Sequence, residues 1–272
     1  MDINDLHRLQ QVQLGILKDI VKFCDEHDIQ YYLMYGTLLG AIRHNGIIPW
    51  DNDIDICMNR ENYEKLWTLS DKLPSDLQLL LVGSGDERRE YGLSRVHKKD
   101  TLIYSPSHGK DGAFPIHIDV FVLDYAKKRS GINEKLAFGL CKFLEIGKLS
   151  KYEKSWLYER FSDNFLKKSL VRFSDIVRIL FKESTVEHFI NRTMASKEKT
   201  NEYIVLTALK DKFPVEYFAD GEKAMYDGEL MTVPKEWDAI LKRIYGDYMT
   251  PPPENERFTA NMDEVIIEFP IE

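Results

Sequence analysis

Three aspartates, Asp51, Asp53 and Asp55, are spaced two residues apart. Ile54 and Ile56 follow the second and the third of them. Because successive side chains of a strand point to opposite faces, this spacing predicts a strand with all three carboxylates on one face and the isoleucines in the core. Stacking three like charges is costly unless a cation neutralises them. Hard divalent cations prefer oxygen ligands and commonly bind one or two carboxylates together with substrate phosphates. The spacing therefore favours a metal site for phosphate chemistry.

A second segment, 117–121, repeats this alternation. His117 and Asp119 would share one face of a strand, and the residues between them are apolar. If the two strands are neighbours in one sheet, Asp53, Asp55 and Asp119 form a site of three carboxylates. The prediction depends on that pairing.

The acidic run has two other interpretations. A solvated turn is the common setting of an isolated Asp-x-Asp, and the flanking apolar residues make it less favoured here. A calcium-binding EF-hand loop needs Gly at its sixth position and Glu at its twelfth. This chain has Ile56 and Asn62 there, so the EF-hand is excluded.

A possible phosphate-binding turn precedes the acidic run. Gly36 and Thr37 follow an apolar segment that ends at Met34, and a helical pattern continues through Arg43. The backbone N–H groups and the positive dipole end at such a helix start can bind a phosphate. Many Gly-Thr pairs only begin helices, so the pair gains meaning from the strand before it and the aspartates after it.

The rest of the chain predicts the elements that would position these side chains. Apolar residues at helical spacing predict an amphipathic helix over 5–27, a helix over 61–69, and one around 237–245 that ends at Gly246. Apolar and alternating segments predict strands at 29–34, 53–57, 77–82, 91–96, 101–104 and 116–123. This pattern predicts an α/β (α+β) fold, a mixed sheet flanked by helices.

Composition excludes several classes of protein. The 272 residues include 37 Lys and Arg against 45 Asp and Glu, and a net charge of −8 argues against a dedicated nucleic-acid-binding protein. The cysteines, Cys24, Cys57 and Cys141, are too few and too far apart for a disulfide scaffold or a CxxC metal pair, which favours a reducing compartment. No apolar run approaches the roughly 20 residues that span a bilayer. We therefore expect a cytoplasmic protein.

The charge is unevenly distributed. Residues 127–199 hold 17 Lys and Arg against 9 Asp and Glu, a local net charge of +8. A helical stripe with basic residues between its members predicts a block of amphipathic helices; the stripe is Leu166, Leu170, Phe173, Val177 and Leu180. This basic block has three interpretations: a platform for an anionic acceptor, a contact with an anionic membrane leaflet, or a solvated face.

These observations predict three parts of the chain. Residues 1–125 would form the catalytic core, residues 126–200 a basic helical insertion, and residues 201–272 a C-terminal segment that packs back on the core.

Several segments together carry a family resemblance. They are Tyr35-Gly36-Thr37-Leu38-Leu39-Gly40, Arg43-His44, Pro49-Trp50-Asp51-Asn52-Asp53-Ile54-Asp55, the His-Ile-Asp-Val-Phe stretch that ends at Phe121, and Tyr245-Gly246-Asp247-Tyr248-Met249 with Pro251-Pro252. With these segments the chain resembles, from end to end, the LicD family of phosphotransferases. That family is related to fukutin and fukutin-related protein and belongs to the nucleotidyltransferase-fold superfamily.

The resemblance implies an activity. LicD proteins are associated with moving phosphocholine from CDP-choline to a sugar hydroxyl of teichoic acid, lipopolysaccharide or a related glycan such as a capsule precursor, which releases CMP. The acceptor would be lipid-linked or soluble. Alternatives are LicD-like transfer of phosphoethanolamine or a glycosyl phosphate, nucleotidyl transfer to a small molecule, and a non-catalytic glycan-binding protein. The animal relatives carry an N-terminal membrane anchor, and we expect none in this chain, which favours a bacterial-type enzyme, in the cytoplasm or peripheral at the inner membrane face.

The resemblance also assigns roles. Asp53 and Asp55 would hold Mg²⁺ or Mn²⁺, and Asp119 would be a third ligand or the base that takes the proton of the acceptor hydroxyl. Asn52 departs from the family, where bacterial members often have Asp, but strand alternation directs residue 52 away from the metal.

The remaining candidates would bind substrate. A quaternary ammonium such as choline is typically held by aromatic faces, which points to Tyr35, Trp50 and Tyr104, with Trp50 favoured because it precedes the acidic strand. Among candidate phosphate contacts Arg43 is favoured, since it lies one helix after the glycine turn. The full substrate-binding set is Gly36, Thr37, Arg43, His44, Trp50, Asp51, Arg95, Tyr104 and His117.

Overall fold

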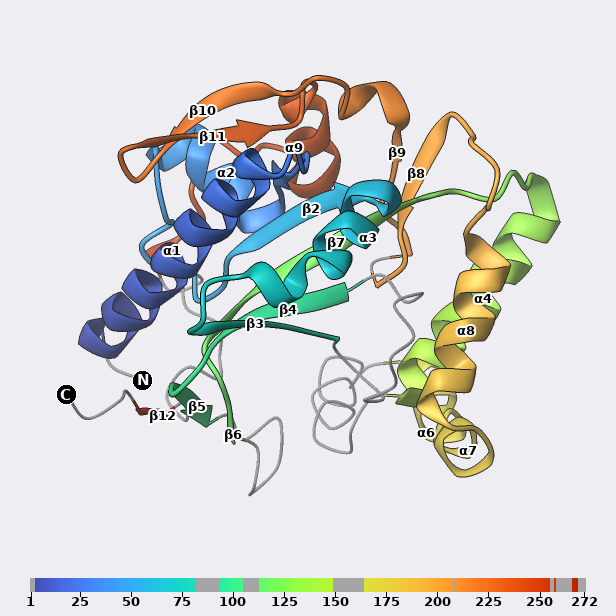
Figure 1. Ribbon diagram of the computed structural model, residues 1–272. Coiled ribbons are helices and arrows are strands. Elements are labelled where there is room, and N and C mark those ends of the chain that lie inside the picture. The colour runs from blue at the N-terminus through green and yellow to red at the C-terminus, as the bar shows by residue number, and fades with distance from the viewer. Residues whose placement is uncertain are drawn as a thin grey trace.

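A curled mixed sheet forms the centre of the computed structural model, which describes residues 3–81, 93–104, 113–148, 164–207, 209–254, 257 and 266–268 (Figure 1). The strand order is β1-β2-β7-β4-β3, and β8 and β9 extend the sheet from β7. Only β2 and β7 pair in parallel in this sheet. The strands are β1 (Tyr32–Leu33), β2 (Asp55–Asn59), β3 (Leu77–Leu81), β4 (Leu93–Lys98), β7 (His117–Tyr125), β8 (Glu202–Val205) and β9 (Lys212–Pro214).

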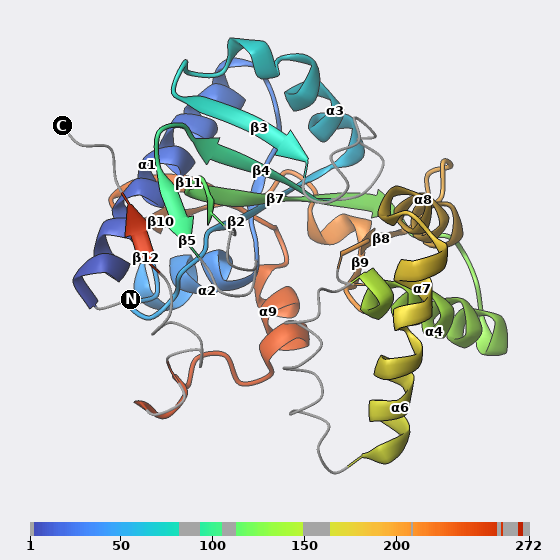
Figure 2. The same ribbon diagram turned by 90° about the horizontal axis from the view of Figure 1, so that it is seen from below.

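Helices cover both faces of the central strands. Figure 2 shows α1 (Ile3–Glu26) and α3 (Arg60–Thr68) on one side of β2 and β7, and α2 (Tyr35–His44) with α9 (Trp237–Tyr245) on the other. The hairpin of β10 (Glu222–Tyr226) and β11 (Glu229–Val233) packs against α2 and β1.

A small sheet joins β5 (Leu102–Tyr104), β6 (Ala113–Phe114) and β12 (Ile266–Glu268). Short 3-10 helices span Ser70–Lys72 and Val215–Tyr217.

Local sequence explains where these elements begin and end. Asn59 caps α3, because its side-chain oxygen accepts a hydrogen bond from the Asn62 backbone N–H at 2.9 Å. Asn45 ends α2 in the left-handed conformation, with φ of 55°. Along β7 the buried Ile118 and Val120 alternate with the half-buried side chains of the opposite face.

Four helices form a separate block after β7. They are α4 (Gly131–Lys148), α6 (Phe165–Phe173), α7 (Asp175–Leu180) and α8 (Glu183–Met194), and we call residues 127–194 the helical insertion. Its own core includes Cys141, Val177 and Ile190, and it joins the sheet through Ile204 and Leu206 at the end of β8. The main core instead joins α1, α2, the central strands and α9.

The structure confirms the mixed α/β class and most of the expected elements. Three details differ: the first strand is only β1, β2 begins at Asp55 and not at Asp53, and the predicted helical stripe breaks at Ser174 into α6 and α7. None of the described helices is long and apolar enough to cross a bilayer. The three-part division of the chain stays a prediction.

Candidate active site

The two acidic segments meet on the parallel strands β2 and β7. Asp55 and Asp119 are register partners, and the Asp119 N–H donates to the Ile54 carbonyl at 2.8 Å. The pairing on which the three-carboxylate prediction depends is therefore present. Asp55 is buried and Asp119 is half-buried.

Asp51 and Asp53 reach the same place from a loop and not from a strand. The Asp51 N–H donates to the Ile48 carbonyl at 2.9 Å, and the Asn52 N–H donates to Asp51 Oδ1 at 3.2 Å. The charge of Asp53 raises the pKa of Asp51, so the two carboxyl groups lie close together. The four carboxylates thus gather through a folded loop beside two strands, and strand alternation explains only part of the cluster.

The Gly-Thr turn fixes the start of β2. Thr37 Oγ1 accepts a hydrogen bond from the Asp55 N–H at 2.8 Å, and the Met34 N–H donates to the Asp55 carbonyl at 3.0 Å. A Cβ on Gly36 would lie 2.4 Å from Asp51 Oδ2, so only glycine allows this carboxylate to pack against the turn. Gly36 and Thr37 therefore position the acidic loop as well as beginning α2.

Two glutamines of α1 hold the same loop from the other side. Gln10 Nε2 donates to the Asp51 carbonyl at 2.8 Å. Gln13 Nε2 donates to the carbonyls of Asn52 and His117, at 3.1 and 3.2 Å, and so ties the acidic loop to the start of β7. Sequence reasoning missed both residues, because they look like ordinary polar positions of an amphipathic helix. Their burial is the signal, and it is seen only in the structure.

Burial and mutual repulsion act together on the carboxylates. Loss of water, followed by repulsion from the neighbouring Asp53, raises the pKa of Asp51 to about 8. The pKa of Asp55 lies well above its usual value for the same two reasons, with Asp53, Asp119 and Asp51 as the repelling groups. Reduced hydration also raises the pKa of Asp53, although its side chain reaches solvent. The cluster is therefore costly to ionise without a positive partner.

One such partner is Arg95 of β4. Its Nε lies 2.8 Å from Asp119 Oδ1, and its guanidinium lowers the Asp119 pKa against the larger upward effect of burial. His117 Nε2 lies 3.7 Å from the same oxygen, while its Nδ1 is 3.0 Å from the Pro115 carbonyl. Arg95 and His117 thus lie beside the acidic cluster, and their predicted role in substrate binding stays a prediction.

A divalent cation matches this cluster in donor chemistry. All four acidic side chains offer oxygen, the donor that Mg²⁺ and Mn²⁺ prefer. Their pKa values are raised, so a positive charge beside them would stabilise their ionised forms. Within the described part of the chain, however, no three His, Cys, Asp or Glu side chains lie so that they could hold a metal ion together. Asp119 points one oxygen at Arg95. The residues fit the ion in type and charge.

A basic and aromatic corner lies beside the carboxylates. The Arg43 guanidinium, 5.9 Å from the Trp50 ring centre, donates from Nη1 to the Tyr248 carbonyl at 2.7 Å. Arg257 lies 4.7 Å from the same ring centre, and His44 packs edge-on against it at 5.6 Å. Burial lowers the pKa of Arg43, and the negative charge of Asp51 partly offsets this effect. The arginine therefore interacts electrostatically with the acidic loop.

Other aromatic residues border the cluster. Tyr245, which belongs to one of the segments that carry the family resemblance, lies near the carboxylates. Loss of water raises the pKa of its hydroxyl, and the charges of Asp55, Asp51 and Asp53 raise it as well. Tyr35 donates from its hydroxyl to Asp211 Oδ2 at 3.0 Å and packs edge-on against Phe121. The side chain of Tyr104, a predicted substrate contact, lies outside the described residues, although its backbone pairs with β12 and β6.

Comparison with known proteins adds a family. Residues 28–131 match the family model described as LicD/FKTN/FKRP, nucleotidyltransferase domain. The chain is 26% identical to the lipopolysaccharide cholinephosphotransferase LicD of Haemophilus influenzae, over 96% of this chain and 98% of that protein. It is also 45% identical to an uncharacterized protein of Rickettsia prowazekii, over 17% of this chain and 18% of that protein.

Proposed function

From the membership of residues 28–131 in the LicD family, as its nucleotidyltransferase domain, we propose that this protein is a phosphotransferase that moves phosphocholine from CDP-choline to a sugar hydroxyl of a cell-surface glycan. The observation that carries the proposal is the cluster of Asp51, Asp53, Asp55 and Asp119, held between the Gly-Thr turn and α1. Phosphoryl transfer needs positioning and charge neutralisation more than covalent chemistry, and a rigid acidic cluster that binds a cation supplies both.

Asp53, Asp55 and Asp119 would hold Mg²⁺ or Mn²⁺, which neutralises the charge that develops on the donor phosphates. The acceptor oxygen forms a bond to the phosphorus that bears choline, and the bond from that phosphorus to the CMP oxygen breaks. Arg95 engages Oδ1 of Asp119, so we assign Oδ2 either to the cation or to the proton that leaves the acceptor hydroxyl.

The basic corner of Arg43, Arg257 and Trp50 suits the anionic part of the donor. Both guanidiniums already lie within cation–π distance of the Trp50 ring, so a quaternary ammonium would have to replace one of them. A phosphate would instead meet two positive charges beside the acidic loop. We therefore place the donor phosphates at this corner; Trp50 as a choline contact stays an alternative.

The acceptor class follows from the relative. The Haemophilus influenzae protein is named for lipopolysaccharide, and we propose the same class of glycan acceptor here, with teichoic acid and capsule precursors as alternatives. We further propose a cytoplasmic location at the inner membrane face, where the helices of residues 126–200 would be the contact.

Product analysis tests the function. The protein is incubated with Mg²⁺, a lipopolysaccharide acceptor and, in separate reactions, CDP-choline, CDP-ethanolamine or CTP. We expect CMP release and phosphocholine on the glycan with CDP-choline. Transfer from CDP-ethanolamine alone would reassign the donor, and pyrophosphate release from CTP would support nucleotidyl transfer. Melting temperatures measured with each nucleotide identify the donor that binds the native state, even where the acceptor is wrong.

A further inference from the structure

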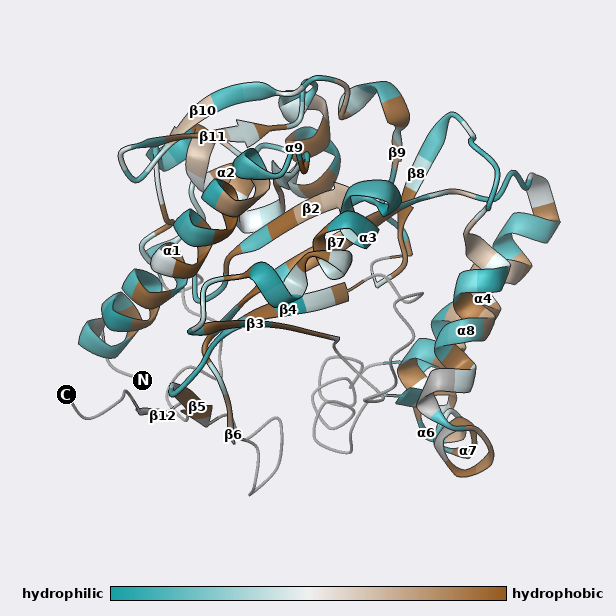
Figure 3. Cartoon of the chain, in the orientation of Figure 1, coloured by the Kyte–Doolittle hydropathy of each residue, from teal (hydrophilic) through white to brown (hydrophobic). Residues whose placement is uncertain are grey.

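The helical insertion exposes an unusual amount of apolar surface. Of the sixteen large apolar residues that are exposed in the described structure, twelve lie between Ile132 and Phe189. Soluble proteins scatter such residues singly, and a concentration of them marks an interaction surface. Figure 3 shows hydrophobic residues on α7, at the outer end of the insertion, as well as along the central strands.

The exposed residues include most of the stripe found in the sequence. On α6, Phe165 and Leu166 are each 80% exposed and Phe173 is 66% exposed, while Val171 is the buried residue that contacts the protein. At 100° per residue, Phe165, Leu166, Leu170 and Phe173 occupy one arc of the helix, and Lys167 and Arg172 lie at its two edges. An apolar arc with basic residues at its edges is typical of helices that lie in a membrane interface.

The interior of the insertion does not need this arc. Cys141, Val177, Val186 and Ile190 already form its core, each less than 4% exposed. The outward residues of α6 are therefore additional to the packing that holds the helices together.

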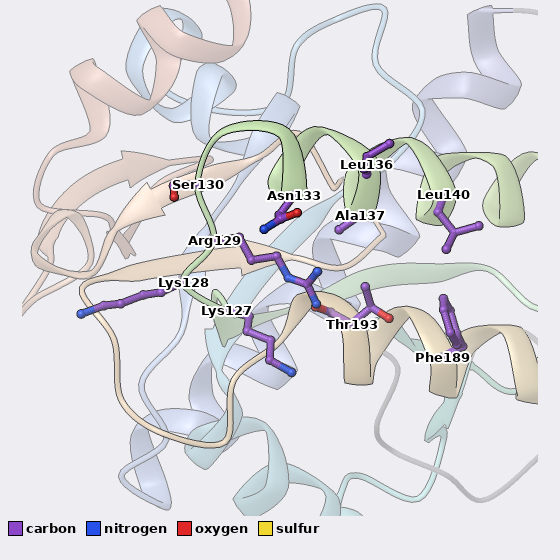
Figure 4. A pocket seen from close by; sticks show the side chains of 10 residues that line it. All are labelled: Lys127, Lys128, Arg129, Ser130, Asn133, Leu136, Ala137, Leu140, Phe189 and Thr193. Carbon is purple, nitrogen blue, oxygen red and sulfur yellow. The ribbon is translucent and has the colours of Figure 1, made fainter.

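A cleft at the other end of the insertion combines charge with apolar surface. It lies between α4 and α8, with a volume of about 760 Å³. Figure 4 shows Lys127 and Arg129 toward one end, and Leu140 and Phe189 toward the other. Lys127 Nζ and Arg129 Nη2 donate to the carbonyls of Arg192 and Thr193 at the end of α8, at 3.3 and 2.9 Å. Lysine has three N–H donors and arginine five, so both keep donors for an anion.

This cleft is separate from the acidic cluster. Along β7, Tyr125 lies six positions after Asp119, about 20 Å at the rise of a strand, and the insertion begins beyond that end. A ligand head group bound at Lys127 and Arg129 therefore would not take part in the chemistry at Asp119.

We propose that the helical insertion docks on the surface of an anionic lipid bilayer, with the apolar arc of α6 in the interface and a lipid phosphate in the cleft between α4 and α8. Charge selects this occupant: residues 127–199 carry a net charge of +8, which attracts anionic head groups and opposes the approach of a second copy through the same face. The proposal deepens the membrane location proposed above, and it does not depend on the identity of the transferred group.

Vesicle flotation tests the proposal with the full chain and no nucleotide. We expect the protein to float with vesicles of equal parts phosphatidylglycerol and phosphatidylcholine, to stay unbound with phosphatidylcholine alone, and to be released by high salt. Equal binding to both vesicles, or binding to neither, would overturn it. So would a dimer in sedimentation analysis that the α6 variants below convert to monomer, because the apolar arc would then face a second copy.

Paired variants locate the surface. Leu166→Ser with Leu170→Ser removes half of the α6 arc, and we expect roughly tenfold weaker vesicle binding. The matched control is Leu230→Ser on β11, where the residue is 61% exposed and lies outside the insertion. Lys127→Glu, where we place the lipid phosphate, should weaken binding by roughly tenfold as well, against the control Lys235→Glu. Unchanged binding of Lys127→Glu would remove the cleft from the proposal. An equal loss of binding in a control variant would show that the effect is not specific to this surface.

These measurements separate the two proposals. Vesicle binding involves neither donor nor acceptor, so its failure leaves the phosphotransfer proposal standing. Loss of CMP release in a protein that still floats with anionic vesicles would contradict only the phosphotransfer. Far-ultraviolet circular dichroism and melting temperature confirm that each variant is folded.

Discussion

The acidic cluster and the helical insertion break the usual pattern of burial in opposite ways: the first buries charged side chains, and the second exposes apolar ones. On β2 and β7 the protein buries carboxylates, held in place by Thr37, Gln10 and Gln13. On α6 it exposes Phe165 and Leu166, which a soluble core would normally cover. Burying charge and exposing apolar surface are both unfavourable alone. These two departures support the ligands that we propose for the regions, a cation with phosphates at the first and a lipid surface at the second.

Gly36→Ala should give the largest effect of the packing variants. The new Cβ would lie 2.4 Å from Asp51 Oδ2, so the Asp51 carboxylate must move, and a displacement near 1 Å at a reacting centre costs about 10²-fold in rate. Steady-state CMP release measures it. Gly15→Ala is the control, because a Cβ there meets nothing within 4 Å; a comparable loss in that variant would contradict the packing argument.

Gln13→Ala should destabilise the site from the side of α1. Its Nε2 joins the carbonyls of Asn52 and His117, and leaving buried acceptors without a donor costs about 1–3 kcal/mol. Urea unfolding measures the free energy, with the exposed Gln11→Ala as the control on the same helix. If the two variants are equally stable, Gln13 does not hold the loop.

The pH dependence of stability should reveal the buried carboxylates in metal-free protein. The pKa of Asp51 is raised to about 8 in the folded state, so folded protein binds more protons than unfolded protein. Stability is therefore fully present below the ordinary Asp range near pH 4 and falls as pH rises toward about 8. Melting temperatures across this range test the sign, and Asp51→Asn should flatten the slope. A rising curve that Asp51→Asn leaves unchanged would contradict the assignment.

Phe165→Ser should give the smallest effect on stability, which sharpens the contrast between the regions. Because the side chain is 80% exposed, we expect a change within about 0.5 kcal/mol, typical of surface substitutions. Urea unfolding of this variant, beside Val171→Ser on the buried side of the same helix, measures it. A large loss at Phe165 would show that the residue packs inside the protein.

Part of this account follows from the sequence alone. The alternation at 117–121 and the acidic run correctly predicted that Asp55 and Asp119 each lie on a strand, because side-chain alternation is a local property of the backbone. That the two strands are neighbours was a condition of the predicted site, and only the structure shows it. The parallel order of β2 and β7 and the approach of Gln13 depend on long-range packing, which single-sequence periodicity does not encode. The stripe around Leu170 predicted a helix correctly, but periodicity alone does not tell whether a stripe faces a core or solvent.

The most direct test of the central claim is CMP release by Asp53→Ala beside the parent protein, with CDP-choline, Mg²⁺ and a lipopolysaccharide acceptor. Asp53 is the acidic residue of the cluster whose side chain reaches solvent, so its removal should spare the fold. We predict that release falls to the background rate while the melting temperature, measured without metal, stays the same or rises, since one repelling charge is gone. Release near the parent rate would contradict a cation-binding acidic cluster as the catalytic site.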